Sequence, residues 1–461
     1  MKKTVVINVV GLTKRLIGEH TRHIAAFLKK GTAAYIKPVF PAVTCSAQAT
    51  YLTGKYPTEH GIVGNGWYFK DECEVKFWRQ SNKLIQREKI WEKMKRVDPD
   101  FTCANLFWWY NMYATTDYNV TPRPNYLADG RKIPDVYSHP AELRDTLQKE
   151  LGTFPLFNFW GPKTSIRSSQ WIADATIRTD ELHDPTLTLV YLPHLDYNLQ
   201  RHGLDFSIIS KDLREIDAVV QQLIEHYRKK DANIVLLSEY GIVNVDTPIH
   251  LNRALRKEGL LGIRRERGLE LLDAGASKAF AVADHQIAHI YINDVSVKEQ
   301  VKQLLKNVAG VASVWDDAEL REAGLLHDRC GDLMVLAKEN AWFTYYFWLD
   351  DAKAPDYARM VDIHKKPGYD PLEMMTDPSD PLVMPKVIGK LIRKKMGFRT
   401  VMDIIPLDAT LIKGSHGTEP KDKADYPILI SDGNLGNTGD TIAPTEVFRI
   451  LEQQLTETAT T

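Results

Sequence analysis

The sequence predicts an α/β fold built on a buried parallel sheet that long insertions interrupt. Three short apolar runs rich in β-branched residues are typical of buried strands: Val5–Val10, Leu187–Leu192 and Ile234–Leu237. Between the last two lies an amphipathic helix, whose apolar positions from Ile208 to Tyr227 follow the helical period. A strand, a helix and a strand in that order form a βαβ unit. A chain of 461 residues is long enough for one large unit or for two to three domains.

The overall composition excludes several classes of protein. The 59 basic and 60 acidic side chains nearly balance, whereas binding to a nucleic acid polymer requires a basic excess. No run of eighteen apolar residues is present, so we expect no membrane span. The first residues predict a buried strand rather than a secretory signal. The four cysteines form no CxxC pair, which favours neither a zinc cage nor a disulfide framework, and we expect a cytoplasmic protein.

A segment between the first and second predicted strands contains a candidate nucleophile. Pro41 fixes the entry to a turn, and Thr44 then stands where a helix of small residues, Cys45–Leu52, would begin. A threonine there is commonly a helix N-cap. In the functional alternative, the free N–H groups of the helix hold a phosphate and the hydroxyl attacks it. Taken alone, the segment favours the N-cap.

Polar side chains follow the carboxyl ends of the other predicted strands, where ligands gather in open parallel sheets. Asp196 and His202 come after Leu187–Leu192, and Glu239 comes after Ile234–Leu237. His416 follows a further apolar run, Ala409–Ile412, that we expect to return to the core. Each residue alone is usually a helix cap or a loop residue, but together they predict a site for a divalent cation.

Two long segments separate the predicted core elements. We place the core at 1–70, 185–252 and 396–461, and we expect the insertions 71–184 and 253–395 to form a cap. Each insertion holds an aromatic cluster, Phe107–Tyr113 and Trp342–Trp348. These clusters are expected to pack inside the cap, with a platform for an organic leaving group as the alternative. His285 and His289 lie in a strand-like run and are expected in the core or in a hairpin.

The segment Phe40–Asn65 resembles the nucleophile region of the alkaline phosphatase superfamily, in its nucleotide pyrophosphatase/phosphodiesterase branch. The positions that match are Pro41, Thr44, Thr50, Thr53, Gly54, Pro57, His60, Gly61, Ile62 and Asn65. LPHLD…HG, NVDTPIHLNRALRKEGLL and GSHG follow in the order of the family. The resemblance implies an α/β/α sandwich with a mostly parallel central sheet. It also implies hydrolysis of phosphoryl or phosphonate esters through a covalent intermediate on Thr44, with Asn65 donating to a phosphoryl oxygen.

The resemblance also implies two divalent ions, usually zinc, but the ligand positions depart from the pattern. At the first ion Val10 replaces an aspartate, with Asn8 one pleat deeper, and Glu239-Tyr240 replaces an Asp-His pair. At the second ion Asp196 and His416 match. Gln200 replaces a histidine there, so that Gln200 or His202 would be the third ligand. We therefore expect one tight ion, zinc first and magnesium or manganese as alternatives, on Asp196 and His416.

The resulting functional hypothesis is a metal-dependent hydrolase that acts on a small phosphorylated molecule through Thr44. Lys55, His364 and Tyr240 are the expected substrate-binding residues, and Lys55 or His364 would take over from the lost ligands in lowering the pKa of the Thr44 hydroxyl. The alternative is a catalytically retired or repurposed member of the superfamily, acting as a binding protein or as a component of a biosynthetic pathway. The substituted positions Val10, Gln200 and Tyr240 favour that alternative.

Overall fold

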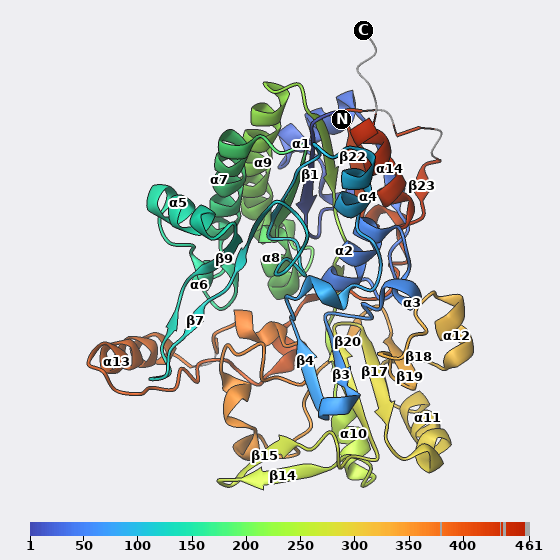
Figure 1. The fold of residues 1–461 in the computed structure, drawn as a ribbon. Coiled ribbons are helices and arrows are strands. Elements are labelled where there is room, and N and C mark those ends of the chain that lie inside the picture. Colours follow the sequence, from blue (N-terminus) through green and yellow to red (C-terminus); the bar gives the residue numbers. More distant parts are fainter. Residues whose placement is uncertain (379, 434, 437–438, 457–461) are drawn as a thin grey trace.

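A nine-stranded mixed sheet forms the centre of one half of the molecule (Figure 1). The computed structural model describes residues 1–378, 380–433, 435–436 and 439–456. In spatial order the strands are β23 (Thr441–Ile442), β2 (Thr32–Ile36), β22 (Ile428–Ser431), β11 (Asn233–Leu237), β1 (Thr4–Val9), β10 (Leu187–Leu192), β5 (Cys103–Leu106), β6 (Tyr118–Pro122) and β9 (Val136–His139). The central strands from β11 to β6 run parallel, and β22 and β9 pair antiparallel to them. The three predicted strands are therefore confirmed as β1, β10 and β11, side by side.

Helices cover both faces of this sheet, which confirms the predicted α/β/α sandwich (Figure 1). One layer contains α1 (Arg22–Lys30), α5 (Ala141–Leu151), α7 (Ile166–His183) and α9 (Phe206–Arg228), and the other contains α2 (Thr44–Thr53), α4 (Ile90–Val97) and α14 (Glu446–Thr456). The predicted amphipathic helix is α9, and its apolar positions from Ile209 to Tyr227 are buried on the sheet side. Among the described residues, no helix is both long and apolar enough to cross a bilayer.

The predicted boundary of the first insertion is wrong. The segment 71–184 supplies β5, β6 and β9 to the main sheet and α4, α5 and α7 to its helical layers, so most of it belongs to the core. The sequence did not show this because these strands are short and are separated by aromatic turns. Phe107 and Trp108, which follow β5, are buried in the core of the sandwich.

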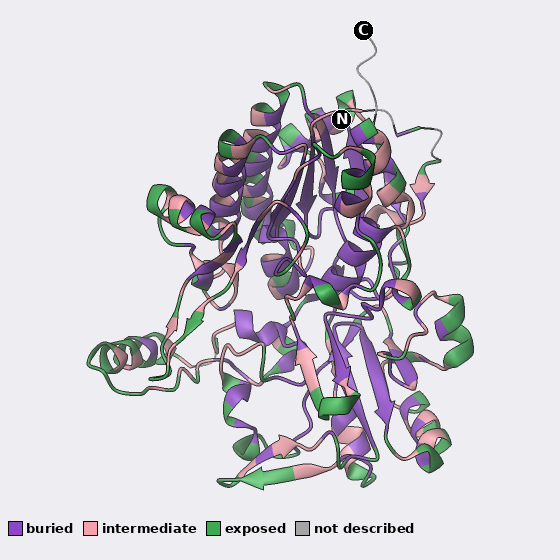
Figure 2. Ribbon diagram, viewed as in Figure 1, coloured by how far each residue is buried: buried purple, intermediate pink, exposed green. Residues whose placement is uncertain are grey.

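The other half of the molecule is a lobe with its own apolar core (Figures 1 and 2). Its four-stranded sheet has the order β16 (Ala279–Asp284), β17 (Ile287–Ile292), β19 (Leu333–Ala337) and β18 (Val311–Trp315). Shorter pairs join β3 (Gly66–Phe69) to β4 (Glu74–Phe77), β14 (Ile263–Glu266) to β15 (Leu269–Leu272), β13 (Thr247–Ile249) to β20 (Ala341–Phe343), β12 (Val243–Asn244) to β21 (Gly414–Ser415), and β7 (Asn125–Tyr126) to β8 (Lys132–Ile133). The remaining α-helices among the described residues, apart from α8 at the site below, are α3 (Pro57–His60), α6 (Leu156–Phe159), α10 (Leu251–Lys257), α11 (Lys298–Lys306), α12 (Asp317–Glu322) and α13 (Val383–Lys395).

Three local expectations for the lobe can be compared with the structure. The aromatic side chains of Trp342–Trp348 are all buried in its core, as the packing interpretation expects. The run around His285 and His289 is a hairpin, with His285 in the turn at φ 63° and His289 in β17. Ala409–Ile412 does not return as a strand of the main sheet, because it forms a 3-10 turn before the short strand β21.

An ion cluster fastens the start of β1 to α7 and α9, and it supports a prediction about stability. Lys3 Nζ lies 2.6 Å from Asp180 Oδ1, and both Lys230 Nζ and His226 Nε2 lie 2.7 Å from Oδ2. Hydrogen bonds from these partners lower the pKa of the Asp180 carboxyl below its usual value, although burial opposes them. We expect Asp180→Asn to lower the free energy of unfolding at pH 7 by about 2 kcal/mol, less than for a fully buried pair because the lysines are partly exposed.

The pH dependence of this effect has a definite sign. A carboxyl with a lowered folded-state pKa stabilises the fold above its unfolded pKa of about 4, and that stabilisation is lost as the pH falls further. Denaturant unfolding should therefore show a difference between wild type and Asp180→Asn at pH 7 that shrinks near pH 3. Asp184→Asn is the control, because Asp184 contacts the same lysines but is 73% exposed. An equal loss in both variants would contradict the role given to Asp180.

Candidate active site

Thr44 begins helix α2 in the interior, at the boundary between the sandwich and the lobe. Its side chain is only 3% exposed, and the preceding Val43 is extended at φ −132°, as expected for a residue before a helix. The backbone N–H of Cys45 donates to Asn65 Oδ1 over 3.1 Å, and Asn65 Nδ2 donates to Asp284 Oδ1 over 3.1 Å. Asn65 thus fixes the start of α2 beside the Thr44 hydroxyl.

A chain of hydrogen bonds runs from Thr44 to the predicted metal ligands. Thr44 Oγ1 and Tyr240 Oη are 3.3 Å apart, and Tyr240 Oη donates to Asp196 Oδ1 over 3.2 Å. Gln200 Nε2 donates to Asp196 Oδ2 over 2.7 Å. Asp196 and Gln200 stand one turn apart on helix α8 (His194–His202), so both side chains leave the same face. The structure therefore brings Thr44, Tyr240, Asp196 and Gln200 together.

His416 reaches the same place from β21. Gly414 makes this approach possible, because a Cβ there would lie 2.0 Å from the carbonyl oxygen of Leu199 in α8. The His416 ring stacks on Tyr240 with 3.5 Å between centroids, and its Nδ1 donates to the carbonyl of Ala42 over 2.7 Å. With the proton on Nδ1, Nε2 presents a lone pair, and it has no hydrogen-bond partner among the described residues. Burial holds the pKa of His416 well below its usual value, so the ring is neutral.

Glu239 lies near Thr44, at the position of the first of the two ions that the resemblance implies. Its Oε1 accepts hydrogen bonds from Asn8 Nδ2 and Gln48 Nε2, both over 2.5 Å. Asn8 is therefore not too deep to reach the site, because Glu239 is one methylene longer than an aspartate. Burial raises the pKa of Glu239 to about 8 and that of Asp196 to about 7. Two carboxyls enclosed without a cation retain their protons more strongly than carboxyls in water.

Three predicted site residues lie elsewhere. Lys55 follows the far end of α2, about 15 Å along the helix from Thr44, and pairs with Glu59 on the surface. His202 is exposed at the end of α8, because six residues of helix turn it away from Asp196. His364 is exposed in the loop before Lys366. These predictions of metal ligation by His202 and substrate binding by Lys55 and His364 are therefore corrected.

Sequence reasoning missed several residues that complete the site. Tyr369, rather than His364, reaches it from that loop, and its hydroxyl donates to Gln200 Oε1 over 2.8 Å. The His285 ring lies 3.8 Å from His416 and 3.7 Å from Tyr369, between centroids. A signal was available, since Asp284-His285 is an Asp-His pair directly after a strand. Trp109, from the first aromatic cluster, also reaches the site, and its backbone N–H donates to Gln48 Oε1 over 2.7 Å.

The donor set suits one divalent ion better than two. Asp196 and the unpartnered Nε2 of His416 are ligand atoms of the right type, and the amide oxygen of Gln200 lies beside them. At the neighbouring position Val10 offers no ligand atom, and Tyr240 presents a neutral phenol whose pKa burial raises well above its usual value. Among the described residues, the one group of three close acidic or imidazole ligands is His194, Asp212 and Glu215, outside this site.

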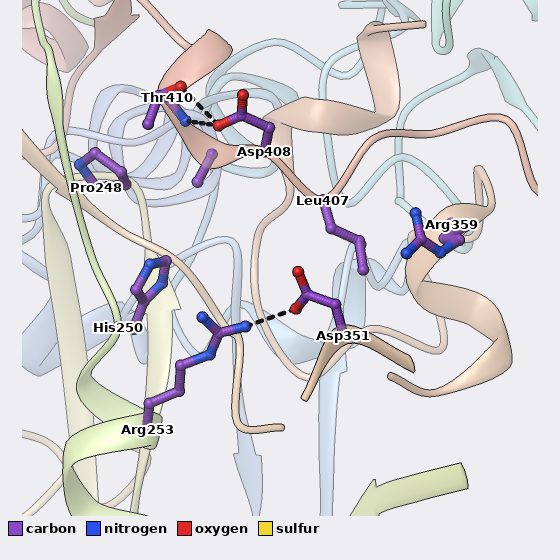
Figure 3. A pocket seen from close by; sticks show the side chains of 9 residues that line it. Pro248, His250, Arg253, Asp351, Arg359, Leu407, Asp408 and Thr410 are labelled. Carbon is purple, nitrogen blue, oxygen red and sulfur yellow. Dashed lines mark hydrogen bonds and ion pairs between the residues drawn. The ribbon is translucent and has the colours of Figure 1, made fainter. Parts of the chain in front are cut away.

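The site is enclosed in this conformation. The side chains of Thr44, Asp196, Gln200, Glu239, Tyr240, Tyr369 and His416 are each less than 9% exposed, and Trp109 at the edge is partly buried. A cavity of about 410 Å³ does open on the lobe (Figure 3), but it contains none of the candidate residues. Its walls include Pro248, His250, Arg253, Asp351, Arg359 and Asp408. Arg253 is already paired with Asp351 across 3.0 Å in that cavity.

Comparison with known families shows to which family the chain belongs. The model of the family "Type I phosphodiesterase / nucleotide pyrophosphatase" matches residues 4–370, which includes Thr44, Asn65, Asp196 and Glu239. The chain belongs to this family. A pyrophosphatase/phosphodiesterase of Schizosaccharomyces pombe is 26% identical over 216 residues, which are 45% of this chain and 38% of the relative. Ectonucleotide pyrophosphatase/phosphodiesterase 2 of Saccharomyces cerevisiae is 25% identical over 231 residues, 47% of this chain and 40% of the relative. The chain thus spans less than half the length of these relatives.

Solved structures share the fold of this family member over nearly its whole length. Murine ectonucleotide pyrophosphatase/phosphodiesterase 5 superposes with a TM-score of 0.60 at 15% identity, covering 100% of this chain and 96% of the other. An inactive threonine-to-alanine variant of that murine protein, in complex with AMP, gives 0.61 at 15% identity, with the same coverage. Phosphonoacetate hydrolase of Sinorhizobium meliloti, in complex with phosphonoformate, gives 0.61 at 12% identity, covering 98% and 96%.

Proposed function

We propose that this protein hydrolyses phosphoryl esters of a small organic molecule, with Thr44 as the nucleophile. The observation that carries the proposal is the position of the Thr44 hydroxyl at the start of α2, between Tyr240 and the Asn65 that anchors the helix. Helix N-termini favour phosphate through their N–H groups and the helix dipole. The matching family supports ester hydrolysis as the class of reaction.

The residues of the chain have separate tasks in this proposal. Thr44 Oγ1 attacks phosphorus, the bond from phosphorus to the leaving oxygen breaks, and water later releases the phosphoryl group from Thr44. Glu239 in its carboxylate form is the acceptor that would take the Thr44 proton, and because burial raises the pKa of Glu239 to about 8, that form prevails only at alkaline pH. Asn65 has a second amide hydrogen, besides the one on Asp284, to donate to a phosphoryl oxygen.

A metal ion belongs to the proposal, because the family is generally metal-dependent. Asp196 and His416 would hold one ion, with Gln200 beside them, and zinc is the ion that suits this ligand set. When bound, that ion would supply positive charge for the phosphoryl oxygens. Tyr240 replaces the imidazole of a second ion and instead joins Thr44 to Asp196 by hydrogen bonds.

A binding protein without catalytic activity is the second candidate, and one observation favours it. In this structure, residues at the predicted ion-binding positions bind one another instead. The Asp196 carboxylate accepts hydrogen bonds from both Tyr240 and Gln200. Such a protein would bind a phosphorylated molecule or AMP without turnover.

Hydrolysis of chromogenic esters separates the two candidates. The purified protein is mixed with bis(p-nitrophenyl) phosphate, p-nitrophenyl phosphate and a phosphonate ester, each with added Zn²⁺, Mg²⁺ or Mn²⁺, and Thr44→Ala is the blank. Release of p-nitrophenolate above the blank supports the hydrolase. Saturable binding of AMP or of a substrate analogue, with no turnover under any of these conditions, would replace it by the binding protein.

The bridge made by Tyr240 has a measurable consequence. We expect Tyr240→Phe to reduce kcat about 10- to 100-fold, because a hydrogen bond to a charged group contributes about 1.5–3 kcal/mol. The ring stack on His416 remains, so the melting temperature should change little. Tyr345→Phe is a suitable control, since that phenol is equally buried in the lobe core. Equal rates for wild type and Tyr240→Phe would remove Tyr240 from the reaction.

A further inference from the structure

Helix α13 projects from the side of the molecule and leaves most of its surface uncovered (Figures 1 and 2). Val387 is its one buried residue among those described. The apolar side chains of the helix and its continuation are largely exposed: Leu382 58%, Met384 55%, Ile388 53%, Leu391 45%, Ile392 54%, Met396 61%, Phe398 57% and Val401 54%. We call these eight residues the α13 face. Soluble monomers seldom expose so many adjacent large apolar side chains.

The α13 face has the periodicity of an amphipathic helix. Met384, Ile388, Leu391 and Ile392 are spaced by four, three and one residues, so they share one side of the helix. Helix α13 projects away from the body of the protein, so an extended flat partner can reach the helix (Figure 1).

The charge of the same segment is entirely positive. Residues 383–401 contain six basic side chains and no acidic one: Lys386, Lys390, Arg393, Lys394, Lys395 and Arg399. Lys386 pairs with Asp380 across 2.5 Å, and Lys390 pairs with Asp403. The other four have no carboxylate partner among the described residues, so a strong positive field surrounds the α13 face.

The β7–β8 hairpin extends this surface. Arg399 donates to the carbonyl of Ala128 at the hairpin tip, which holds the two segments together. Tyr126 and Ile133 of the hairpin are 59% and 40% exposed, and Lys132 lies 5.6 Å from the Tyr126 ring centroid. An amphipathic tyrosine beside lysines is typical of the headgroup level of a bilayer.

We propose that the α13 face binds the surface of a bilayer that contains anionic lipids. The apolar side chains would enter the headgroup–acyl boundary while the flanking cations meet the lipid phosphates, as basic amphipathic helices do. A second copy of this chain is a poor occupant, because two segments with four uncompensated basic residues each repel one another. This peripheral association goes beyond the proposed hydrolysis and does not depend on it.

Co-sedimentation of the full chain with vesicles tests the proposal. Vesicles of phosphatidylcholine alone are compared with vesicles that contain about 30% phosphatidylserine, at low salt and at about 0.5 M NaCl. The protein should pellet with the anionic vesicles at a lipid concentration about tenfold below that needed with neutral vesicles, and salt should weaken the binding. Failure to pellet with anionic vesicles at low salt would overturn the proposal.

Matched variants separate the apolar and the charged contributions. Leu391→Asn with Ile392→Asn, and separately Arg393→Glu with Lys394→Glu and Lys395→Glu, should each raise the lipid needed about tenfold or more. Lys29→Glu with Lys30→Glu and Lys37→Glu makes the same charge change on exposed sites away from α13, and its binding should stay within about twofold. Equal binding by all variants would overturn the proposal. So would dimerisation that is lost in the Leu391→Asn/Ile392→Asn variant, or capture of an acidic polypeptide such as polyglutamate in place of vesicles.

Discussion

Replacing Thr44 by alanine should abolish ester hydrolysis while leaving the fold intact. Loss of a nucleophile that forms a covalent intermediate commonly costs more than about 10³-fold in kcat. The fold should tolerate the change, because the backbone of Cys45 remains anchored by Asn65. The measurement is the rate of p-nitrophenolate release at saturating ester, with the melting temperature taken for each variant.

Thr44→Ser and Thr53→Ser are the matched controls for that result. Thr44→Ser keeps a hydroxyl at the start of α2 and should retain activity within about 100-fold of wild type. Thr53 lies at the other end of the same helix, where its hydroxyl donates to the carbonyl of Ala49, so Thr53→Ser should leave the rate unchanged. Activity of Thr44→Ala equal to that of wild type would exclude Thr44 as the nucleophile.

Removing the imidazole of His416 should abolish both ion binding and activity. The neutral Nε2 of His416 presents a free lone pair to an ion. Without this imidazole, Asp196 is the single strong ligand of the site. We expect His416→Ala to lose its bound ion on dialysis and to slow hydrolysis about 10³-fold, since Lewis-acid stabilisation contributes several kcal/mol. Elemental analysis and kinetics on the same sample provide the measurement.

His202→Ala and His194→Ala provide the corresponding controls. His202 is exposed at the end of α8, so its removal should change neither the ion content nor the rate. His194 belongs to the separate group with Asp212 and Glu215, and His194→Ala would reveal an ion held there instead. Loss of the ion from His202→Ala as well as from His416→Ala would restore His202 as the third ligand that the sequence suggested.

Much of the fold was predictable because buried parallel strands and a long amphipathic helix have strong local patterns. β1, β10, β11 and α9 were found within two residues of their observed limits. The strands β5, β6 and β9 were missed, because each is short and their pairing with distant strands leaves no local signature. The boundary between core and insertion was wrong for the same reason.

The site was predictable where residues follow the ends of recognised strands. Thr44, Asn65, Asp196, Glu239, Tyr240 and His416 all meet in the structure, and the motif order had placed them together. Tyr369 and His285 come from the lobe, whose packing against the sandwich cannot be derived from local pattern. Lys55 and His364 were chosen for their chemistry alone, without a structural reason for their direction, and both lie on the surface.

Titration of the metal-free protein with Zn²⁺, while hydrolysis of bis(p-nitrophenyl) phosphate is followed, tests the central claim most directly. That claim is that Thr44 is the nucleophile of a site that holds one ion, on Asp196 and His416. A second ion is not bound, because Val10 and Tyr240 stand where its ligands would be. Activity should rise linearly and reach its maximum at one equivalent of bound ion per chain. A maximum that requires two bound equivalents, or an absence of turnover at every ion concentration, would contradict it.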